Sequence, residues 1–194
     1  VPYFVIHRKG LKPDGSTPTI LYGYGGFEIS PKPSYSATIG KLWLERGGAY
    51  AVANIRGGGE FGPRWHKAAL KTNRQRAYDD FTAVAGDLAS RGIAPPMRLA
   101  LPGGTHRGLC VGPIFTQRPH LMHAVVCRVP LLDMMRYTKL LAGASWAAEY
   151  GDPEDSAMRT AILKYSPYQN IFPERKYPKV FIETSTKDDR VHPG

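Results

Sequence analysis

The sequence predicts an α/β fold in which a mostly parallel central sheet carries helices on both faces. Short and nearly continuous apolar stretches, typical of strands buried on both sides, alternate with longer stretches of helical periodicity. Turns rich in Gly and Pro separate these stretches. With 194 residues the chain is long enough for one substantial core, and no internal boundary suggests a second one.

The first half of the chain alternates strands with helices around two glycine-rich loops. Gly92 is placed to end the helix predicted for residues 76–91, because glycine readily adopts the left-handed conformation that often follows a helix. The apolar residues Phe81, Val84, Ala85 and Leu88 of that helix recur at i, i+3, i+4 and i+7. The predicted strands are residues 1–9, 19–23 and 49–55, and the predicted helices are residues 38–46 and 76–91.

The second half continues the alternation. We expect residues 134–150 to be helical or loop-like, and residues 151–155 to form a turn. The predicted strands are residues 97–101, 123–129 and 178–184, and the predicted helices are residues 106–117 and 156–164.

One stretch, Leu99-Ala-Leu-Pro-Gly-Gly-Thr-His-Arg-Gly108, predicts a strand, a tight turn and a helix with Thr105 at the apex. The same layout forms the nucleophile elbow Gly-x-Ser-x-Gly of α/β-hydrolases, which raises a serine hydroxyl above a parallel sheet. Here Thr105 stands where serine is expected, and Arg107 stands where the second glycine is expected. A β-branched residue in a strained turn and a long side chain at a close crossing both disfavour the usual geometry. The sequence therefore predicts an elbow without its nucleophile.

Composition argues against several other functions. The formal net charge is +10, but the Lys and Arg residues are scattered and accompany no nucleic-acid-binding motif, so a solvated basic surface is favoured. No apolar run approaches the ~20 residues of a membrane helix. Cys110 and Cys127 lack the spacing of a metal or redox site. We expect buried free thiols, a reducing cytoplasmic compartment, and neither metal nor organic cofactor.

Five motifs occur in a characteristic order. They are Tyr22-Gly-Tyr-Gly-Gly-Phe27, Asn54-Ile-Arg-Gly-Gly-Gly-Glu60 with Trp65-His66, the elbow, Gly143-Ala-Ser-Trp146 with Glu149-Tyr-Gly151, and Asp188-Asp-Arg-Val191. In this order they resemble the catalytic α/β-hydrolase domain of a bacterial member of the prolyl oligopeptidase family. The resemblance implies that residues 1–194 are a partial catalytic domain, without the family's N-terminal β-propeller and truncated before the last strand or strands and helix. It also implies that one face or edge of the sheet lies uncovered.

The resemblance assigns catalytic roles to four residues. Thr105 occupies the position of the nucleophile, and Asp188 that of the acid that orients the catalytic histidine. The backbone N–H of His106 and the hydroxyl of Tyr24 correspond to the two oxyanion donors. In the family the histidine lies a few tens of residues beyond the aspartate, and none of the six histidines of this chain has that position.

The resemblance also assigns a binding site for the substrate. Phe27, Trp146 and Tyr150 correspond to the pocket for proline, where Trp146 stacks on the ring, and Arg190 to a residue that donates to a substrate carbonyl. Without the resemblance, Trp146 and Tyr150 are equally typical of a plain core, since they lie four residues apart on one helix face.

These assignments predict a serine-type peptidase that cleaves short proline-containing peptides by acyl transfer. The sequence at Thr105 and the missing histidine predict that this chain itself does not turn over substrate, because an unassisted hydroxyl is a poor nucleophile. The alternative is a non-catalytic protein or fragment that binds proline-containing peptides.

Overall fold

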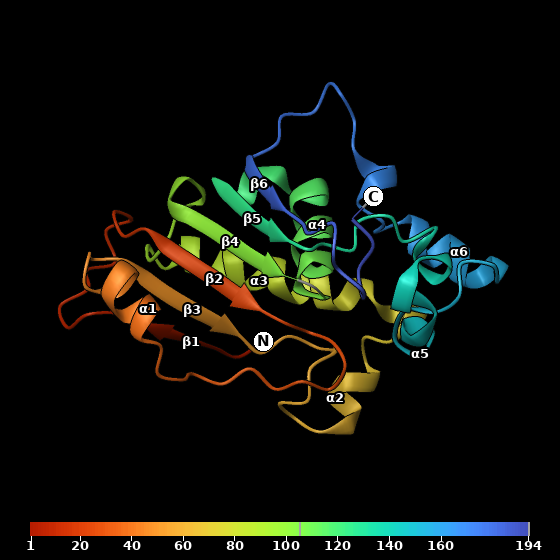
Figure 1. Ribbon diagram of the computed structural model, residues 1–194. Coiled ribbons are helices and arrows are strands. Elements are labelled where there is room, and N and C mark those ends of the chain that lie inside the picture. Colours follow the sequence, from red (N-terminus) through yellow and green to blue (C-terminus); the bar gives the residue numbers. More distant parts are fainter. Residues whose placement is uncertain (105, 194) are drawn as a thin grey trace.

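The computed structural model describes residues 1–104 and 106–193, with the side chains of residues 106–109 left aside. Within these residues a six-stranded sheet has the order β1-β3-β2-β4-β5-β6 (Figure 1). Strand β1 pairs with β3 in the antiparallel direction, and every other pairing is parallel. The strands are β1 (Tyr3–Ile6), β2 (Thr19–Gly23), β3 (Ala49–Ala53), β4 (Leu99–Gly104), β5 (Ala124–Arg128) and β6 (Lys179–Glu183). The predicted mostly parallel α/β fold is confirmed.

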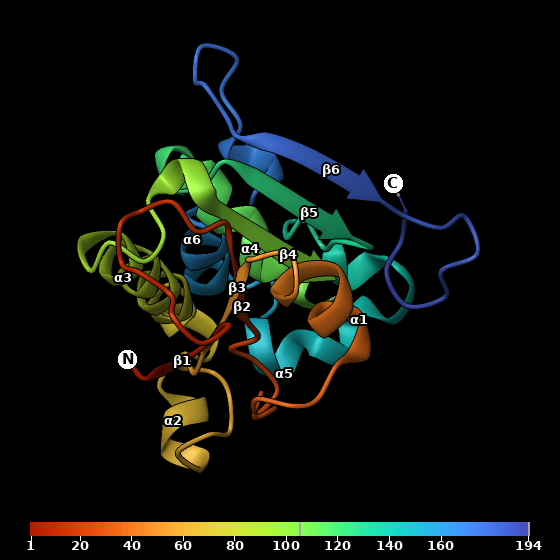
Figure 2. The same ribbon diagram turned by 90° about the vertical axis from the view of Figure 1, so that its left-hand side faces the viewer.

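Two long helices cover one face of the sheet. Helix α3 has seven buried residues, and α4 lies against β4 and β5. The face they cover carries Leu21, Ala51, Leu101 and Cys127, each fully buried. Figure 2 shows these helices on one side of the sheet and α1 on the other. The α-helices are α1 (Ala37–Ile39), α2 (Pro63–Lys67), α3 (Gln75–Ser90), α4 (His106–Gln117), α5 (Ala147–Tyr150) and α6 (Ser156–Leu163).

Helix α3 ends as the sequence predicts. Gly92 follows the helix with φ +68°, and its N–H donates to the carbonyl of Ala89 at 3.0 Å. The N–H of Ile93 donates to the carbonyl of Leu88 at 2.9 Å. This pair of bonds is the Schellman motif, in which a left-handed residue lets the last carbonyls of a helix find donors.

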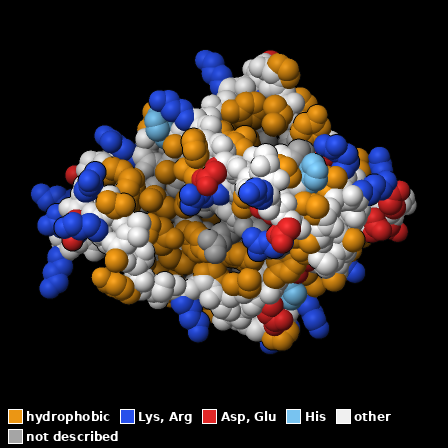
Figure 3. Space-filling model, in the orientation of Figure 1, with side chains coloured by type: hydrophobic (Ala, Val, Ile, Leu, Met, Phe, Trp, Pro, Cys, Tyr) orange, Lys and Arg blue, Asp and Glu red, His pale blue; other side chains and the backbone are white. Residues whose placement is uncertain are grey.

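The opposite face of the sheet is covered unevenly. Helix α1 and the π-helical turn Gly40–Leu44 lie over the β3 side, whereas the β5 and β6 side is open. Val126 and Phe181, which pair on this face, are 37% and 61% exposed. Figure 3, drawn in the orientation of Figure 1, shows apolar side chains gathered in a hollow of the surface. Helices therefore lie on both faces, as predicted, and part of one face is uncovered, as also predicted.

The main differences from the sequence expectations are local. The helix expected at residues 38–46 consists of one α turn followed by a π-helical turn. The short helix α2 was not expected, because Pro63–Lys67 follows a glycine run and shows no apolar periodicity. Residues 134–150 form 3₁₀ turns, Tyr137–Lys139 and Leu141–Trp146, followed by α5.

Candidate active site

The predicted site residues follow the carboxyl ends of three parallel strands. Tyr24 and Phe27 follow β2, the elbow follows β4, and Asp188 and Arg190 follow β6. Because the carboxyl ends of parallel strands meet at one edge, the topology brings these segments to the same side of the sheet. This edge is where ligands bind in open α/β sheets.

The predicted strand and helix are present on either side of Thr105. Strand β4 ends at Gly104, and α4 begins at His106. The N–H of His106 therefore belongs to the first turn of a helix, where backbone donors lack partners within the helix and favour negative charge. Thr105 lies outside the described residues, as do the side chains of His106 and Arg107.

Asp188 lies in the turn after β6. Its Oδ1 accepts hydrogen bonds from the backbone N–H groups of Val191 and Arg190, each at 2.9 Å. These two bonds lower the pKa of the Asp188 carboxyl, since they stabilise its charged form. The same bonds fix the turn that presents Arg190 and buries Val191. Asp188 is thus an ionised carboxylate that also shapes the neighbouring pocket.

A cavity of about 190 Å³ lies beside this turn and brings Trp146 together with Arg190. Trp146 is 9% exposed, so only a small part of its ring is accessible. The wall is largely apolar, and Asp133 and Arg136 on it already form an ion pair. The other described lining residues are Pro130, Leu131, Leu132, Leu140, Tyr168, Ile182, Thr184, Val191, His192 and Pro193. The arrangement suits a small apolar ring flanked by a carbonyl that accepts from a guanidinium.

Phe27 and Tyr150 form a separate aromatic pair. Their rings make an edge contact at 5.7 Å between centroids, and Tyr150 makes a second edge contact with Tyr137 at 5.9 Å. Tyr150 is fully buried, and burial raises the pKa of its hydroxyl well above the usual value. Neither Phe27 nor Tyr150 is among the described residues that line the cavity beside Trp146. Tyr150 therefore lies behind Phe27 and supports it.

The loop that carries Tyr24 and Phe27 rests on a second glycine-rich loop. Tyr24 is 9% exposed. A Cβ added at Gly57, which has φ +96°, would lie 2.3 Å from the carbonyl oxygen of Gly25. The two backbones therefore approach more closely than any side chain permits, which explains the glycine run after Arg56. This glycine run therefore has a structural role.

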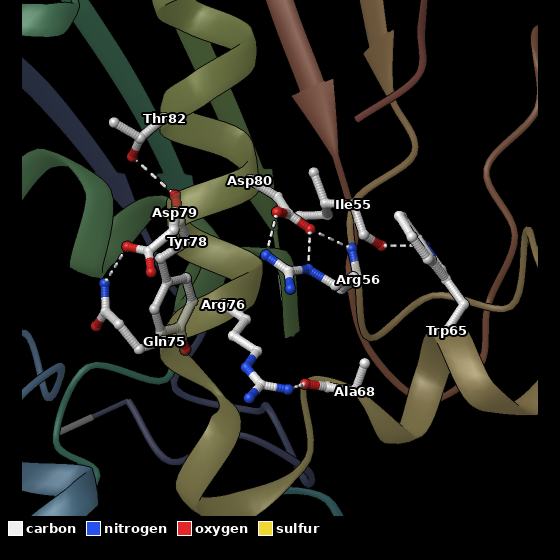
Figure 4. A network of polar contacts seen from close by, with 10 residues as sticks. All are labelled: Ile55, Arg56, Trp65, Ala68, Gln75, Arg76, Tyr78, Asp79, Asp80 and Thr82. Carbon is white, nitrogen blue, oxygen red and sulfur yellow. Dashed lines mark hydrogen bonds and ion pairs between the residues drawn. The ribbon is translucent and has the colours of Figure 1, made fainter.

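The second glycine-rich loop, which begins at Arg56, is in turn bound to α3. The side chain of Asp80 accepts from the backbone N–H of Arg56 at 2.9 Å and from its guanidinium at 2.8 and 2.6 Å (Figure 4). On the other side, Trp65 Nε1 donates to the carbonyl of Ile55 at 3.0 Å. The glycine-rich loop beneath the site is therefore fixed to α3 by three hydrogen bonds from Arg56 to the Asp80 carboxylate.

A buried polar cluster adjoins the loop that carries Tyr24 and Phe27. No sequence pattern predicts that its members meet. Glu149 is 4% exposed, and its carboxylate accepts from the backbone N–H of Phe27 at 2.9 Å. His66 Nε2 lies 2.8 Å from the second carboxylate oxygen, and Arg74 Nη1 lies 3.5 Å from the first. His66 and Glu149 do occur in the recognised motifs, but 83 residues separate them, so no local pattern pairs them.

Comparison with known proteins identifies the family of the chain. The model of the prolyl oligopeptidase family matches residues 33–194. The chain belongs to the prolyl oligopeptidase family. Relatives within this family are similar to the chain from end to end, but they are much longer.

Two curated relatives and one solved structure of the family illustrate this. The chain is 58% identical over 193 residues to the uncharacterized peptidase y4nA of Sinorhizobium fredii, covering 100% of the chain and 27% of that protein. It is 45% identical over 195 residues to a prolyl endopeptidase of Elizabethkingia meningoseptica, covering 100% and 28%. A post-proline cleaving enzyme from Rickettsia typhi superposes with a TM-score of 0.97 at 47% identity, covering 99% of the chain and 28% of that structure. The chain spans little more than a quarter of these relatives.

Membership of the prolyl oligopeptidase family agrees with the α/β-hydrolase fold of the chain. Within the described part of the chain, no group of three or more His, Cys, Asp or Glu side chains could hold a metal ion. None of the described helices combines the length and the apolar character needed to cross a bilayer.

Proposed function

We propose that residues 1–194 form part of the catalytic domain of a serine-type peptidase that cleaves short peptides after proline by acyl transfer. The observation that carries this proposal is the cavity that joins Trp146 to Arg190 beside the ionised Asp188. Trp146 would stack on the proline ring, and the guanidinium of Arg190 would donate to a peptide carbonyl. Relatives named prolyl endopeptidase and post-proline cleaving enzyme support the same substrate class.

The oxyanion would form between β2 and the start of α4. Attack on the carbonyl carbon of the proline residue places negative charge on its oxygen, and two donors, the Tyr24 hydroxyl and the His106 N–H, would stabilise it. Losing one such donor typically costs ~3–4 kcal/mol of transition-state stabilisation. Asp188 would orient a histidine base contributed by sequence outside residues 1–194, and we propose that a β-propeller domain completes the longer protein.

We further propose that the 194-residue polypeptide does not hydrolyse peptides and instead binds them. Thr105 stands at the nucleophile position and Arg107 at a position where the elbow needs a small residue. The binding pocket, by contrast, is lined by residues present in this chain, which favours retained recognition of proline.

Two measurements test these proposals. The first is hydrolysis of a fluorogenic Gly-Pro substrate by the chain and by its Thr105→Ala variant. We expect no signal above background from either, and activity that disappears in Thr105→Ala would overturn the proposed inactivity. The second is calorimetric titration with a proline-containing peptide and with the same peptide carrying alanine. Heat with the proline peptide alone supports the binding function, and no heat with either contradicts it.

We also propose a reducing, cytoplasmic compartment. Cys110 and Cys127 are both buried thiols outside any disulfide, and burial raises the pKa of each to about 12. Such thiols are protonated and unreactive, as suits a compartment in which disulfides do not persist. Thiol labelling and peptide mapping of denatured protein from its native host should find Cys110 and Cys127 both labelled, and a disulfide at either residue would contradict the proposal.

A further inference from the structure

The loop that carries Tyr24 and Phe27 is held in a strained conformation. Phe27 and Glu28 are consecutive non-glycine residues with φ of 53° and 56°. Such a backbone conformation is unfavourable for a residue with a side chain and persists only where the surroundings determine it. Two hydrogen bonds within the loops contribute, from Ile29 N–H to the carbonyl of Gly26 at 3.0 Å and from Glu28 N–H to that of Gly57 at 3.3 Å.

The third restraint comes from a distant part of the chain. Glu149 Oε1 accepts from the N–H of Phe27 across 122 residues of sequence, at 2.9 Å. The Glu149 carboxylate therefore binds the backbone at Phe27, the first of the two residues with positive φ.

Glu149 is itself held from two sides. His66 Nε2 lies 2.8 Å from Oε2, and Arg74 Nη1 lies 3.5 Å from Oε1. Arg74 is only 1% exposed, and its guanidinium carbon lies 5.4 and 5.3 Å from the ring centroids of Tyr78 and Tyr150. Each carboxylate oxygen therefore has its own partner, and the buried negative charge faces a buried positive one.

A buried ion pair is a poor source of stability, since desolvation offsets most of the attraction. An apolar cluster of the same volume could fill this space equally well. What an apolar cluster lacks is an acceptor aimed at the N–H of Phe27. The geometry therefore favours a role in fixing the loop.

We propose that Glu149 is a positioning residue, which fixes the backbone of Phe27 and through it the placement of the Tyr24 hydroxyl and the Phe27 ring, with His66 and Arg74 orienting its carboxylate. The consequence for substrate rests on the proposed function, because it assumes that Tyr24 and Phe27 face the peptide. The restraint on the loop does not rest on it.

Amide hydrogen exchange in the free chain tests the restraint directly. Glu149→Ala should accelerate exchange of the Phe27 amide at least about tenfold, because that N–H loses its acceptor. The control is Asp155→Ala, which removes the N-terminal cap of α6, a bond of 2.8 Å to Met158 N–H, and destabilises the fold away from the loop. If the Phe27 amide exchanges no faster in Glu149→Ala than in Asp155→Ala, the proposal is wrong.

A milder pair of variants covers the case in which Glu149→Ala does not fold. The His66 side chain is 18% exposed and is more readily replaced than a fully buried group. Glutamine can still donate to Glu149, whereas alanine cannot. We therefore expect His66→Ala to accelerate exchange of the Phe27 amide and His66→Gln to restore most of the protection. Equal exchange in both variants and the unchanged chain would overturn the role of His66.

Calorimetry with the proline-containing peptide separates this proposal from the proposed function. If the unchanged chain binds the peptide, Glu149→Ala should weaken binding about fivefold or more, in parallel with the exchange of Phe27. Unchanged affinity would overturn the link from loop to substrate. If the unchanged chain does not bind the peptide, the proposed function fails, and the exchange data still decide whether Glu149 holds the loop.

Discussion

The side chains of Arg56 and Asp80 form a two-point ion pair, with Nε 2.8 Å from Oδ2 and Nη2 2.6 Å from Oδ1. The backbone N–H of Arg56 donates to the same carboxylate at 2.9 Å. Asp80 is nearly buried, at 5% side-chain exposure, while the Arg56 side chain is 32% exposed. One carboxylate on α3 therefore fixes both the side chain and the backbone at the start of the glycine run.

Asp80→Asn should destabilise the protein by about 2 kcal/mol. The amide keeps one acceptor but leaves the Arg56 guanidinium without its counter-charge, and the partial exposure of Arg56 lowers the cost below that of a fully buried pair. Urea denaturation measures the change. Asp79→Asn is the matched control, since Asp79 is exposed and contacts Gln75 across one helical turn. Equal losses from the two variants would contradict the importance of the Arg56 contact.

Gly57→Ala should destabilise the protein by at least about 2 kcal/mol, because the new Cβ meets the Gly25 carbonyl at 2.3 Å in a backbone with φ +96°. Gly86→Ala is the opposite control. Gly86 lies on the exposed side of α3, a Cβ there meets nothing within 4 Å, and alanine should stabilise the helix by about 0.5–1 kcal/mol. Thermal unfolding should shift in opposite directions, and a tolerated Gly57→Ala would argue against a close loop crossing.

Local pattern was sufficient for the six strands and for α3, α4 and α6. The periodicity of Phe81, Val84, Ala85 and Leu88 specifies the buried side of α3, and Gly92 ends it, because both features depend only on neighbours in sequence. The carboxyl ends of the strands then place Asp188 and the elbow on one side without further information.

Contacts between distant segments could not be predicted from the sequence. Nothing near Glu149 indicates that its carboxylate binds the Phe27 N–H, and nothing near Gly57 indicates contact with Gly25. The surroundings of Trp146 and Tyr150, both assigned to one pocket by resemblance, likewise depend on distant segments: Trp146 lines the cavity with Arg190, and Tyr150 is buried against Phe27. Side-chain neighbours of this kind follow from packing rather than from local propensity.

Glu60→Gln should stabilise the protein near neutral pH by about 1 kcal/mol, since one Glu60 carboxylate oxygen is buried without a hydrogen-bond partner among the described residues. Burial raises the pKa of Glu60 in the folded state, against a weaker opposing effect of its own backbone N–H and Asn54. The contribution of Glu60 to the stability of the fold is therefore fully present below its unfolded pKa. It is lost as the pH rises through its folded pKa.

The gain from Glu60→Gln should accordingly shrink as the pH falls below the usual glutamate pKa of 4.5. Denaturant titrations of both proteins between pH 3 and 7, roughly, give the two stability curves. Curves that stay parallel over this range would show that Glu60 carries no raised pKa.

Arg190→Lys should weaken binding of the proline-containing peptide about tenfold while leaving the fold intact. The turn depends on the backbone N–H groups that donate to Asp188, which lysine retains, whereas the planar guanidinium is lost. Lys187→Ala is the matched control, because Lys187 is an exposed cation of the same turn and does not line the cavity in the described structure. Calorimetry should separate the two variants at equal ionic strength. If both weaken binding equally, general charge attraction rather than the geometry of Arg190 holds the peptide.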